Sequence, residues 1–284
     1  MSELAKYSDE WFLSLYLMCG SVEETVKCYP ENLPMSVANY HRLVRKHGLI
    51  KSAGRHVSLP ETLHFFRLKA AEPGTPLEKL YRGMPLRFQT SLSTLHRIYQ
   101  YMEKQLVRRY AAALIITSGD KGQVLVGREV FGNSRYGKRV GNFSVPMSFA
   151  KKDEPHTDSV LRVLQQEVFS GLAAGGKLKK NSEIVSSILS QSIEPFAYFD
   201  IVDVCVRVYR LDLGQILQDF SSHKLTGHSF INITELQCLE NIRAGVDEIL
   251  GIYEGFLHNP YTVEFPMVGV SEINAAIVMA PSQR

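Results

Sequence analysis

Residues 142–170 read NFSVPMSFAKKDEPHTDSVLRVLQQEVFS, and the rest of the fold can be understood from this stretch. It begins with a short extended run, passes through a polar turn and continues into a helix. The apolar residues of that helix recur at helical spacing and predict one buried stripe, made of Val160, Leu161, Leu164 and Val168. Residue 163 precedes residues 166 and 167 by three and four positions, so these three share one face of the helix.

The polar residues of this stretch resemble the Nudix box in their spacing. In that box, five residues separate a glycine from a glutamate. Seven further residues separate this glutamate from the sequence Arg-Glu-hydrophobic-x-Glu-Glu-x-Gly. Four positions match the box, namely Glu154, Arg162, Leu164 and Glu167, and four depart from it, namely Ser148, Val163, Gln166 and Phe169. The spacing is intact, and half of the chemistry is missing.

The resemblance implies that the face with residues 163, 166 and 167 is where the family holds Mg²⁺, a cation that takes several oxygen ligands and favours anionic ones. Here Val163 offers no ligand, Gln166 offers a neutral amide and Glu167 offers one carboxylate. We therefore predict a Nudix-like domain without hydrolase activity, with no catalytic residue, no metal site and no cofactor. Two alternatives stay open: a Mg²⁺-dependent pyrophosphohydrolase of a nucleoside diphosphate derivative, in which an aspartate joins Glu154 and Glu167, and an ordinary amphipathic helix after a strand.

The sequence on both sides of the box extends the resemblance to about residues 108–258. Upstream, two apolar runs, 111–117 and 123–128, flank a Gly-Asp-Lys-Gly turn and predict two strands. Downstream, residues 195–213 predict long alternating strands, and residues 230–236 are similar to the family's late strand and the turn that follows it. The fold class that follows is α+β, with a C-terminal α/β/α Nudix-like mixed-sheet domain.

Such a domain is expected to bind a nucleotide or an ADP-ribose-like ligand, because some relatives use the cleft in this way and signal to an attached DNA-binding domain. The loop at residues 131–141 supplies glycines and three cations for phosphates, although a solvated loop has the same composition. The predicted ligand-binding residues are Arg128, Arg135, Lys138, Arg139, Glu154, Arg162 and Glu167. Arg162 is also expected to orient the box glutamates through a salt bridge.

Length and composition indicate a folded protein of two or three small domains, since the chain has 284 residues and 45% of them are hydrophobic. No run approaches the roughly eighteen uninterrupted apolar residues of a membrane helix, and the start of the chain has no signal-peptide pattern. The four cysteines form no Cys-x-x-Cys pair, which is typical of reduced structural thiols. We therefore expect an intracellular protein, cytoplasmic or in the nucleoid or nucleus, with no membrane partner.

Positive charge is concentrated in the first 110 residues. This part holds 16 Lys+Arg against 10 Asp+Glu, whereas residues 111–284 hold 16 against 19, and the whole chain carries a net charge of +3. A basic N-terminal third is typical of a part that meets phosphates.

The N-terminal third also repeats itself. With an offset of 55 residues, residues 22–44 align with residues 77–99 without a gap, and their apolar positions correspond. The first copy predicts a helix capped by Ser8 and ended by Gly20, a second that begins at Ser21 or Val22, and a third capped by Ser36 and ended by Gly48.

Residues 49–59 alternate around Ala53-Gly54, which predicts a short basic hairpin after the third helix. Three helices and such a hairpin resemble a winged helix-turn-helix domain, and the second copy repeats the helices without an obvious hairpin. The predicted organisation is a winged helix-turn-helix repeat at 1–60, a second helix-turn-helix repeat at 61–107, the Nudix-like domain at 108–258 and a C-terminal tail at 259–284.

In a helix-turn-helix, the last helix enters the major groove of duplex DNA. Burial of Val37, Tyr40, Leu43 and Val44 would turn outward the residues Ala38, Asn39, Arg42 and Arg45, and Asn suits adenine while Arg suits guanine or phosphate. The predicted nucleic-acid-binding residues are Ser36, Asn39, Arg42, Arg45, Lys46, Lys51, Arg55, Ser91, Thr94 and Arg97. We therefore predict a DNA-binding, transcriptional-regulator-like protein and expect a homodimer, because symmetric DNA sites favour two-fold proteins. A protein-binding scaffold is the alternative.

Overall fold

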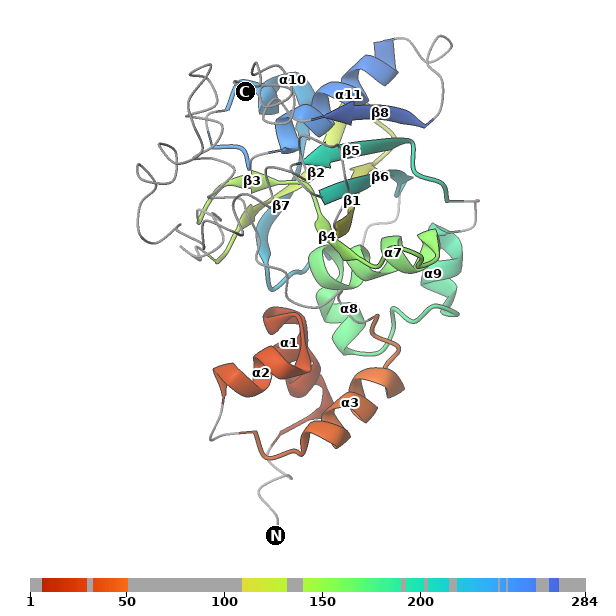
Figure 1. The fold of residues 1–284 in the computed structure, drawn as a ribbon. Coiled ribbons are helices and arrows are strands. Elements are labelled where there is room, and N and C mark those ends of the chain that lie inside the picture. Colours follow the sequence, from red (N-terminus) through yellow and green to blue (C-terminus); the bar gives the residue numbers. More distant parts are fainter. Residues whose placement is uncertain are drawn as a thin grey trace, which may run out of the picture.

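The structure is a computed structural model, and it describes residues 7–29, 33–50, 109–131, 140–189, 193–201, 204–214, 219–239, 241–243, 245–258 and 266–270. Within these residues, three N-terminal helices lie beside a domain of two sheets that helices cover on both sides (Figure 1). The predicted second repeat at 61–107 and most of the predicted hairpin at 49–59 lie outside the described residues. No described helix is long and apolar enough to cross a membrane.

The N-terminal helices are α1 (Asp9–Cys19), α2 (Val22–Cys28) and α3 (Val37–Lys46). A serine hydroxyl precedes each helix and accepts a hydrogen bond from a backbone N–H of its first turn; these serines are Ser8, Ser21 and Ser36. The caps predicted at Ser8 and Ser36 are thus confirmed, and the second helix begins at Val22, one of the two predicted starts. α1 ends at Gly20, whose φ of 83° lies in the left-handed region that favours glycine.

One face of α3 packs on the other N-terminal helices. Tyr40, Leu43 and Val44 are buried, and the Tyr40 hydroxyl donates to the Phe12 carbonyl oxygen at 2.5 Å. Val37 was predicted to be buried with them, but it is 47% exposed, so this part of the prediction is wrong. Val37 is the first residue of α3, and the buried face begins only with Tyr40, about one turn later.

Two sheets form the centre of the larger domain. The five-stranded sheet has the order β4-β1-β6-β5-β8, in which β1–β6 and β5–β8 are parallel pairs, and the three-stranded antiparallel sheet has the order β3-β2-β7. The strands are β1 (Arg109–Thr117), β2 (Gln123–Glu129), β3 (Phe143–Ser144), β4 (Met147–Ala150), β5 (Ala197–Ile201), β6 (Val204–Asp212), β7 (Leu225–Asn232) and β8 (Met267–Val270). The strands predicted on both sides of the box are confirmed as β1, β2, β5 and β6.

Helices cover both sides of these sheets, as Figure 1 shows. The side next to α1–α3 carries α7 (His156–Val163), the π-helical turn η3 (Leu164–Val168), α8 (Ser170–Ala174) and α9 (Glu183–Ile188), and the other side carries α10 (Ile233–Gln237) and α11 (Val246–His258). We call residues 109–270 the Nudix-like domain, because mixed sheets between two helical layers are the α/β/α architecture that the resemblance implied. β8 pairs with β5, so part of the tail predicted at 259–284 belongs to this sheet.

β1 separates two hydrophobic cores, because its side chains alternate between the two faces of the sheet. Leu114 and Ile116 belong to the core that also contains side chains of α7, η3 and α1–α3, whereas Ala113 and Ile115 belong to the core under α10 and α11. The N-terminal helices therefore share a continuous core with the helix that carries the box-like spacing.

Candidate functional site

The segment with the box-like spacing changes its helical geometry in the middle. α7 ends at Val163 and continues as the π-helical turn η3, in which the Phe169 N–H donates to the Leu164 carbonyl oxygen at 2.7 Å. Single π turns of this kind are frequent at functional sites. Val163, Gln166 and Glu167 are 0%, 1% and 3% exposed. Residues 163, 166 and 167 were predicted to share one face of a regular α-helix. The helix widens into a π turn at residues 166 and 167, and all three side chains are buried.

Glu154 and Arg162 form a buried ion pair. The side chain of Arg162 is 0% exposed and that of Glu154 is 7% exposed. The Glu154 carboxylate also accepts from the Ser159 hydroxyl at 2.6 Å, and Arg162 donates to the Phe149 carbonyl oxygen at 3.0 Å. The prediction that Arg162 orients a box glutamate through a salt bridge is thus confirmed for Glu154. Contact of this pair with a ligand stays a prediction.

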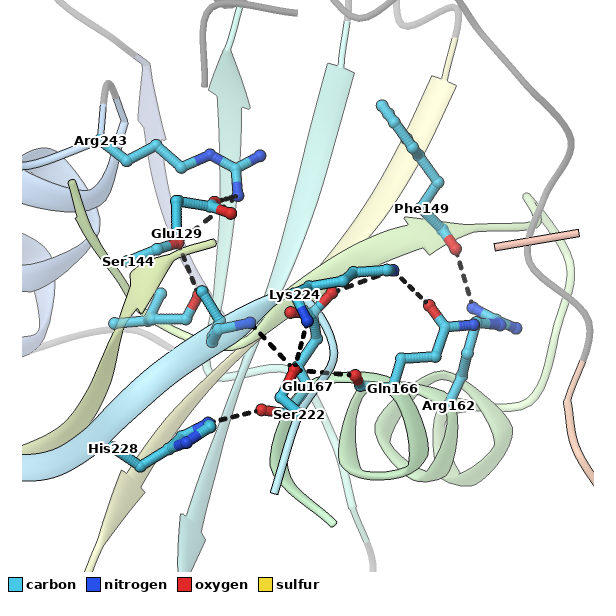
Figure 2. A network of polar contacts seen from close by, with 12 residues as sticks. Glu129, Ser144, Phe149, Arg162, Gln166, Glu167, Ser222, Lys224, His228 and Arg243 are labelled. Atoms are coloured by element: carbon cyan, nitrogen blue, oxygen red, sulfur yellow. Dashed lines mark hydrogen bonds and ion pairs between the residues drawn. The ribbon is translucent and has the colours of Figure 1, made fainter. Parts of the chain in front are cut away.

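Glu167 has a different partner, the ammonium group of Lys224. Figure 2 shows Lys224 reaching η3 from the segment that leads into β7. Its Nζ lies 3.1 Å from Glu167 Oε1 and donates to Gln166 Oε1, also at 3.1 Å. The side chain of Lys224 is 20% exposed and that of Glu167 is 5% exposed. One lysine therefore satisfies oxygens of two consecutive box positions.

The backbone of the π turn is held by the same neighbouring segment and by β7 (Figure 2). The Ser222 hydroxyl donates to the Gln166 carbonyl oxygen at 3.1 Å, and His228 Nε2 lies 2.8 Å from the Glu167 carbonyl oxygen. A carbonyl oxygen only accepts, so Nε2 carries the proton. Burial lowers the pKa of His228 below its ordinary value, which favours the neutral imidazole. The segment before β7 and β7 itself thus hold both the backbone and the side chains of η3.

A third buried carboxylate, that of Glu129 at the end of β2, is also paired. Arg243 donates to Glu129 Oε1 at 2.8 Å and lies 3.4 Å from the Ser144 hydroxyl, as Figure 2 shows. Glu129 is 1% exposed. Its neighbour Arg128, a predicted ligand residue, is exposed, and its guanidinium carbon lies 4.0 Å from the centre of the Phe143 ring. The other predicted cations of this region, Arg135, Lys138 and Arg139, lie outside the described residues.

The donor atoms around Glu167 do not fit the Mg²⁺ that the resemblance implies. Mg²⁺ prefers anionic oxygens, whereas Val163 has an aliphatic side chain, Gln166 has a neutral amide and the Glu167 carboxylate already faces an ammonium group. Across the described part of the chain, no group of three or more His, Cys, Asp or Glu side chains could hold a metal ion. The cluster, as arranged, pairs charges instead of offering a set of anionic oxygens to a divalent cation.

The outward face of α3 brings three of the predicted nucleic-acid-binding residues together. Asn39, Arg42 and Arg45 are exposed, and Arg42 donates to Asn39 Oδ1 at 3.1 Å. Ser36 caps the helix, and Lys46 contacts Asp9 on α1 at 3.2 Å. Hydrogen bonding from Lys46, supported by His47, lowers the pKa of Asp9. The remaining predicted residues, Lys51, Arg55, Ser91, Thr94 and Arg97, lie outside the described residues.

Gln165 connects the two parts of the molecule. Its amide nitrogen donates to the carbonyl oxygens of Gly48 at 3.1 Å and Leu178 at 2.8 Å, and its amide oxygen accepts from the Ile50 N–H at 3.0 Å. Gln165 is 1% exposed and belongs to η3. The chain that leaves α3 is therefore fixed to the same π turn that carries Gln166 and Glu167.

Sequence reasoning missed Lys224, Arg243, Glu129 and Gln165. Lys224 lies 58 positions beyond Gln166, and no spacing rule connects them. Gln165 occupies a variable position of the box-like pattern, so the pattern assigns it no role. The available signal was the position of Glu167 next to Val168 of the predicted buried stripe, because a carboxylate beside the core requires a partner from elsewhere in the chain.

Several solved structures are similar to this chain. A NUDIX hydrolase from Nitrosomonas europaea is 11% identical, with a TM-score of 0.38 and coverage of 58% of this chain and 78% of that chain. The MutT protein from Methanosarcina mazei Go1 is 17% identical, with a TM-score of 0.38 and coverage of 56% and 99%. A C. elegans Ap4A hydrolase is 13% identical, with a TM-score of 0.35 and coverage of 53% and 98%. No protein-family model and no curated protein matches the sequence. These likenesses concern the fold alone.

Proposed function

We propose that this chain is a DNA-binding, transcriptional-regulator-like protein, in which α3 contacts duplex DNA and the Nudix-like domain is a non-catalytic ligand-sensing or dimerising unit. The observation that carries the proposal is the outward face of α3. Asn39, Arg42 and Arg45 lie together on it, while the opposite face is buried. Arginine and asparagine are the side chains best suited to hydrogen bonding with guanine and adenine edges.

The charge of the N-terminal third supports this role. Phosphate contacts supply most of the non-specific affinity for DNA, and they require cations that solvent can reach. Arg42 and Arg45 meet this condition because both are exposed. Ser36 lies at the N-terminus of the same ten-residue helix, where backbone N–H groups suit a phosphate oxygen.

The pairing of the box glutamates supports the non-catalytic role. Glu154 is bound to Arg162, and Glu167 is bound to Lys224. A hydrolase of the box type would need carboxylates that are available to a divalent cation. We infer that the domain instead uses its fold to recognise a nucleotide or ADP-ribose-like ligand, or to join two copies of the chain.

Binding of the full chain to fluorescent duplex DNA tests the proposal. We expect affinity to fall steeply with salt, with a slope of about −0.9 in log K against log [salt] for each neutralised phosphate. The double variant Arg42→Ala/Arg45→Ala should lower affinity and reduce this slope by roughly two. Lys121→Ala/Lys151→Ala removes two exposed cations from the Nudix-like domain and serves as the matched control. Equal losses in both double variants would refute the assignment to α3.

A nucleotide panel tests the non-catalytic part. We expect no Mg²⁺-dependent release of monophosphate from nucleoside diphosphate derivatives by the wild-type chain. Release that Glu167→Gln abolishes would identify an active pyrophosphohydrolase and overturn this part of the proposal. A chain that shows neither DNA binding nor hydrolysis would fit the scaffold alternative.

A further inference from the structure

The Lys224 ammonium group bridges two oxygens that stand at consecutive box positions. Nζ lies 3.1 Å from Glu167 Oε1 and 3.1 Å from Gln166 Oε1. An ammonium group is a compact cation with three donors, so it can serve both oxygens at once. In Figure 2 the two side chains extend from η3 toward the end of the Lys224 side chain.

Burial gives this cation a stabilising role in the folded state. The Glu167 side chain is 5% exposed, and a buried carboxylate is costly unless it is paired and hydrogen-bonded. Lys224 is itself held in place, because its backbone N–H donates to the Ser222 hydroxyl at 3.0 Å and Ser222 in turn donates to the Gln166 carbonyl oxygen. The lysine therefore approaches η3 from a segment that is already bonded to the same turn.

We propose that Lys224 is the permanent counter-ion of Glu167, donates at the same time to the Gln166 amide oxygen, and occupies the position from which a divalent cation would contact these two oxygens. The inference deepens the proposed function and rests on its non-catalytic part, since it names the residue that closes the site to a metal. A covalently attached monovalent cation cannot be removed by a chelator. The carboxylate is neutralised at every cation concentration.

The surroundings distinguish this pair from an ordinary surface salt bridge. Lys180 and Asp158 form such a bridge nearby, with Lys180 58% exposed and the Asp158 side chain 25% exposed. Lys224 is 20% exposed and contacts two acceptors. A fully solvated lysine that formed the same contacts would lose side-chain entropy and would gain little, because water already stabilises its charge. Lys224 instead compensates a carboxylate that is buried.

The proposal is tested by measuring Mn²⁺ binding to the full chain. Bound Mn²⁺ is detected as a decrease in the electron paramagnetic resonance signal of free Mn²⁺. The key comparison is Gln166→Glu against Gln166→Glu/Lys224→Gln. Both present two carboxylates on η3, and only the first keeps the ammonium group. We expect the double variant to bind one Mn²⁺ per chain at least about tenfold more tightly, because a like charge next to the ligand oxygens is removed.

Two further variants in the Gln166→Glu background serve as controls. Lys224→Arg keeps the positive charge and should give no gain in Mn²⁺ affinity. Lys180→Gln removes an exposed cation from the same side of the domain and should also give none. The proposal is overturned if Gln166→Glu/Lys224→Gln binds Mn²⁺ no better than Gln166→Glu, or if Lys180→Gln gives the same gain.

The wild-type chain decides the matter even if the double variant does not fold. We expect the wild-type chain not to bind Mn²⁺ through Glu167. Mn²⁺ binding by the wild type that is lost in Glu167→Gln would overturn the proposal. Metal binding of this kind without nucleotide hydrolysis would refute the role of Lys224 and leave the non-catalytic function standing. Hydrolysis that depends on Glu167 would refute the proposed function itself.

Discussion

Glu154 and Glu167 both match the box-like pattern and are both buried, yet they obtain their cations in different ways. Glu154 pairs with Arg162, which lies eight positions further along the chain and belongs to the same pattern. Glu167 pairs with Lys224, which comes from the segment before β7. The side chain of Arg162 is fully buried, whereas that of Lys224 is 20% exposed.

The two glutamates therefore match the box-like pattern for different structural reasons. The Glu154–Arg162 pair has a structural role, because it joins α7 to the Phe149 carbonyl oxygen of β4. It can therefore persist whether or not the domain binds a metal. At Glu167 the pattern alone offers a carboxylate without a partner, and the tertiary fold supplies one. Under our proposal, a lysine has taken the position of a diffusible cation.

The largest effect is expected from Arg162→Ala, which tests the first pair. It leaves the Glu154 carboxylate in the interior without its cation, and removal of one partner of a buried ion pair costs about 3–5 kcal/mol of unfolding free energy. Urea unfolding followed by circular dichroism measures the change. Lys180→Ala, which breaks the exposed pair with Asp158, is the control and should cost less than about 1 kcal/mol. Similar costs for both variants would mean that burial of the Glu154–Arg162 pair has no energetic consequence.

The next effect concerns Gln165, which stands between the two pairs along the chain. Gln165→Ala removes hydrogen bonds to Gly48, Ile50 and Leu178 and leaves the Ile50 N–H without its partner, so we expect a loss of about 1–3 kcal/mol in the free energy of unfolding. Gln237, an exposed residue of α10, provides the matched control as Gln237→Ala. Hydrogen exchange should also show faster exchange in α3. Unchanged exchange in α3 would show that Gln165 does not couple the two parts.

Lys224→Gln is expected to cost less, about 1–2 kcal/mol, because the lysine is partly solvated and glutamine can still donate to Glu167. A double-mutant cycle with Glu167→Gln measures the interaction in the same urea experiment. The second substitution should cost little once the first has been made, since the pair is then already broken. Additive losses would show that the two side chains act independently.

Much of the fold could be predicted from the sequence because its signals are local. Ser8 and Ser36 cap helices as expected, and each acts within a single turn. A salt bridge between Arg162 and the box glutamates was implied by the resemblance to the Nudix box, and the structure contains it for Glu154. Two apolar runs on either side of the Gly-Asp-Lys-Gly turn likewise identified β1 and β2.

The features that periodicity did not predict depend on contacts between distant segments. The π turn at η3 leaves no mark on the apolar pattern, and Lys224 and Arg243 reach their glutamates from later parts of the chain. Val37 has helical spacing that suits the buried stripe, but the neighbouring helices do not extend over the first turn of α3. The burial and the partners of such residues depend on which helices and strands pack together, and a single sequence does not reveal this packing.

The smallest effect, a pH dependence, tests how the backbone of Glu167 is held. Burial lowers the pKa of His228 below its ordinary value of 6.5, so the unfolded chain takes up a proton before the folded chain does as pH falls. The stability that comes from neutral His228 is therefore complete above about pH 6.5 and is lost as pH falls from there toward the lower pKa of the folded state. His228→Gln keeps an N–H donor for the Glu167 carbonyl oxygen and cannot titrate in this range.

We therefore expect His228→Gln to lose less unfolding free energy than the wild type when urea unfolding is compared at about pH 7.5 and about pH 5.5. A residual dependence should remain, because burial also lowers the pKa of His223. The backbone and carboxylate of Glu167 act in the opposite direction and raise the pKa of His228, but burial has the larger effect. An identical pH profile in the variant and the wild type would mean that His228 is equally easy to protonate in the folded and unfolded chains, and that the π turn does not depend on its neutral form.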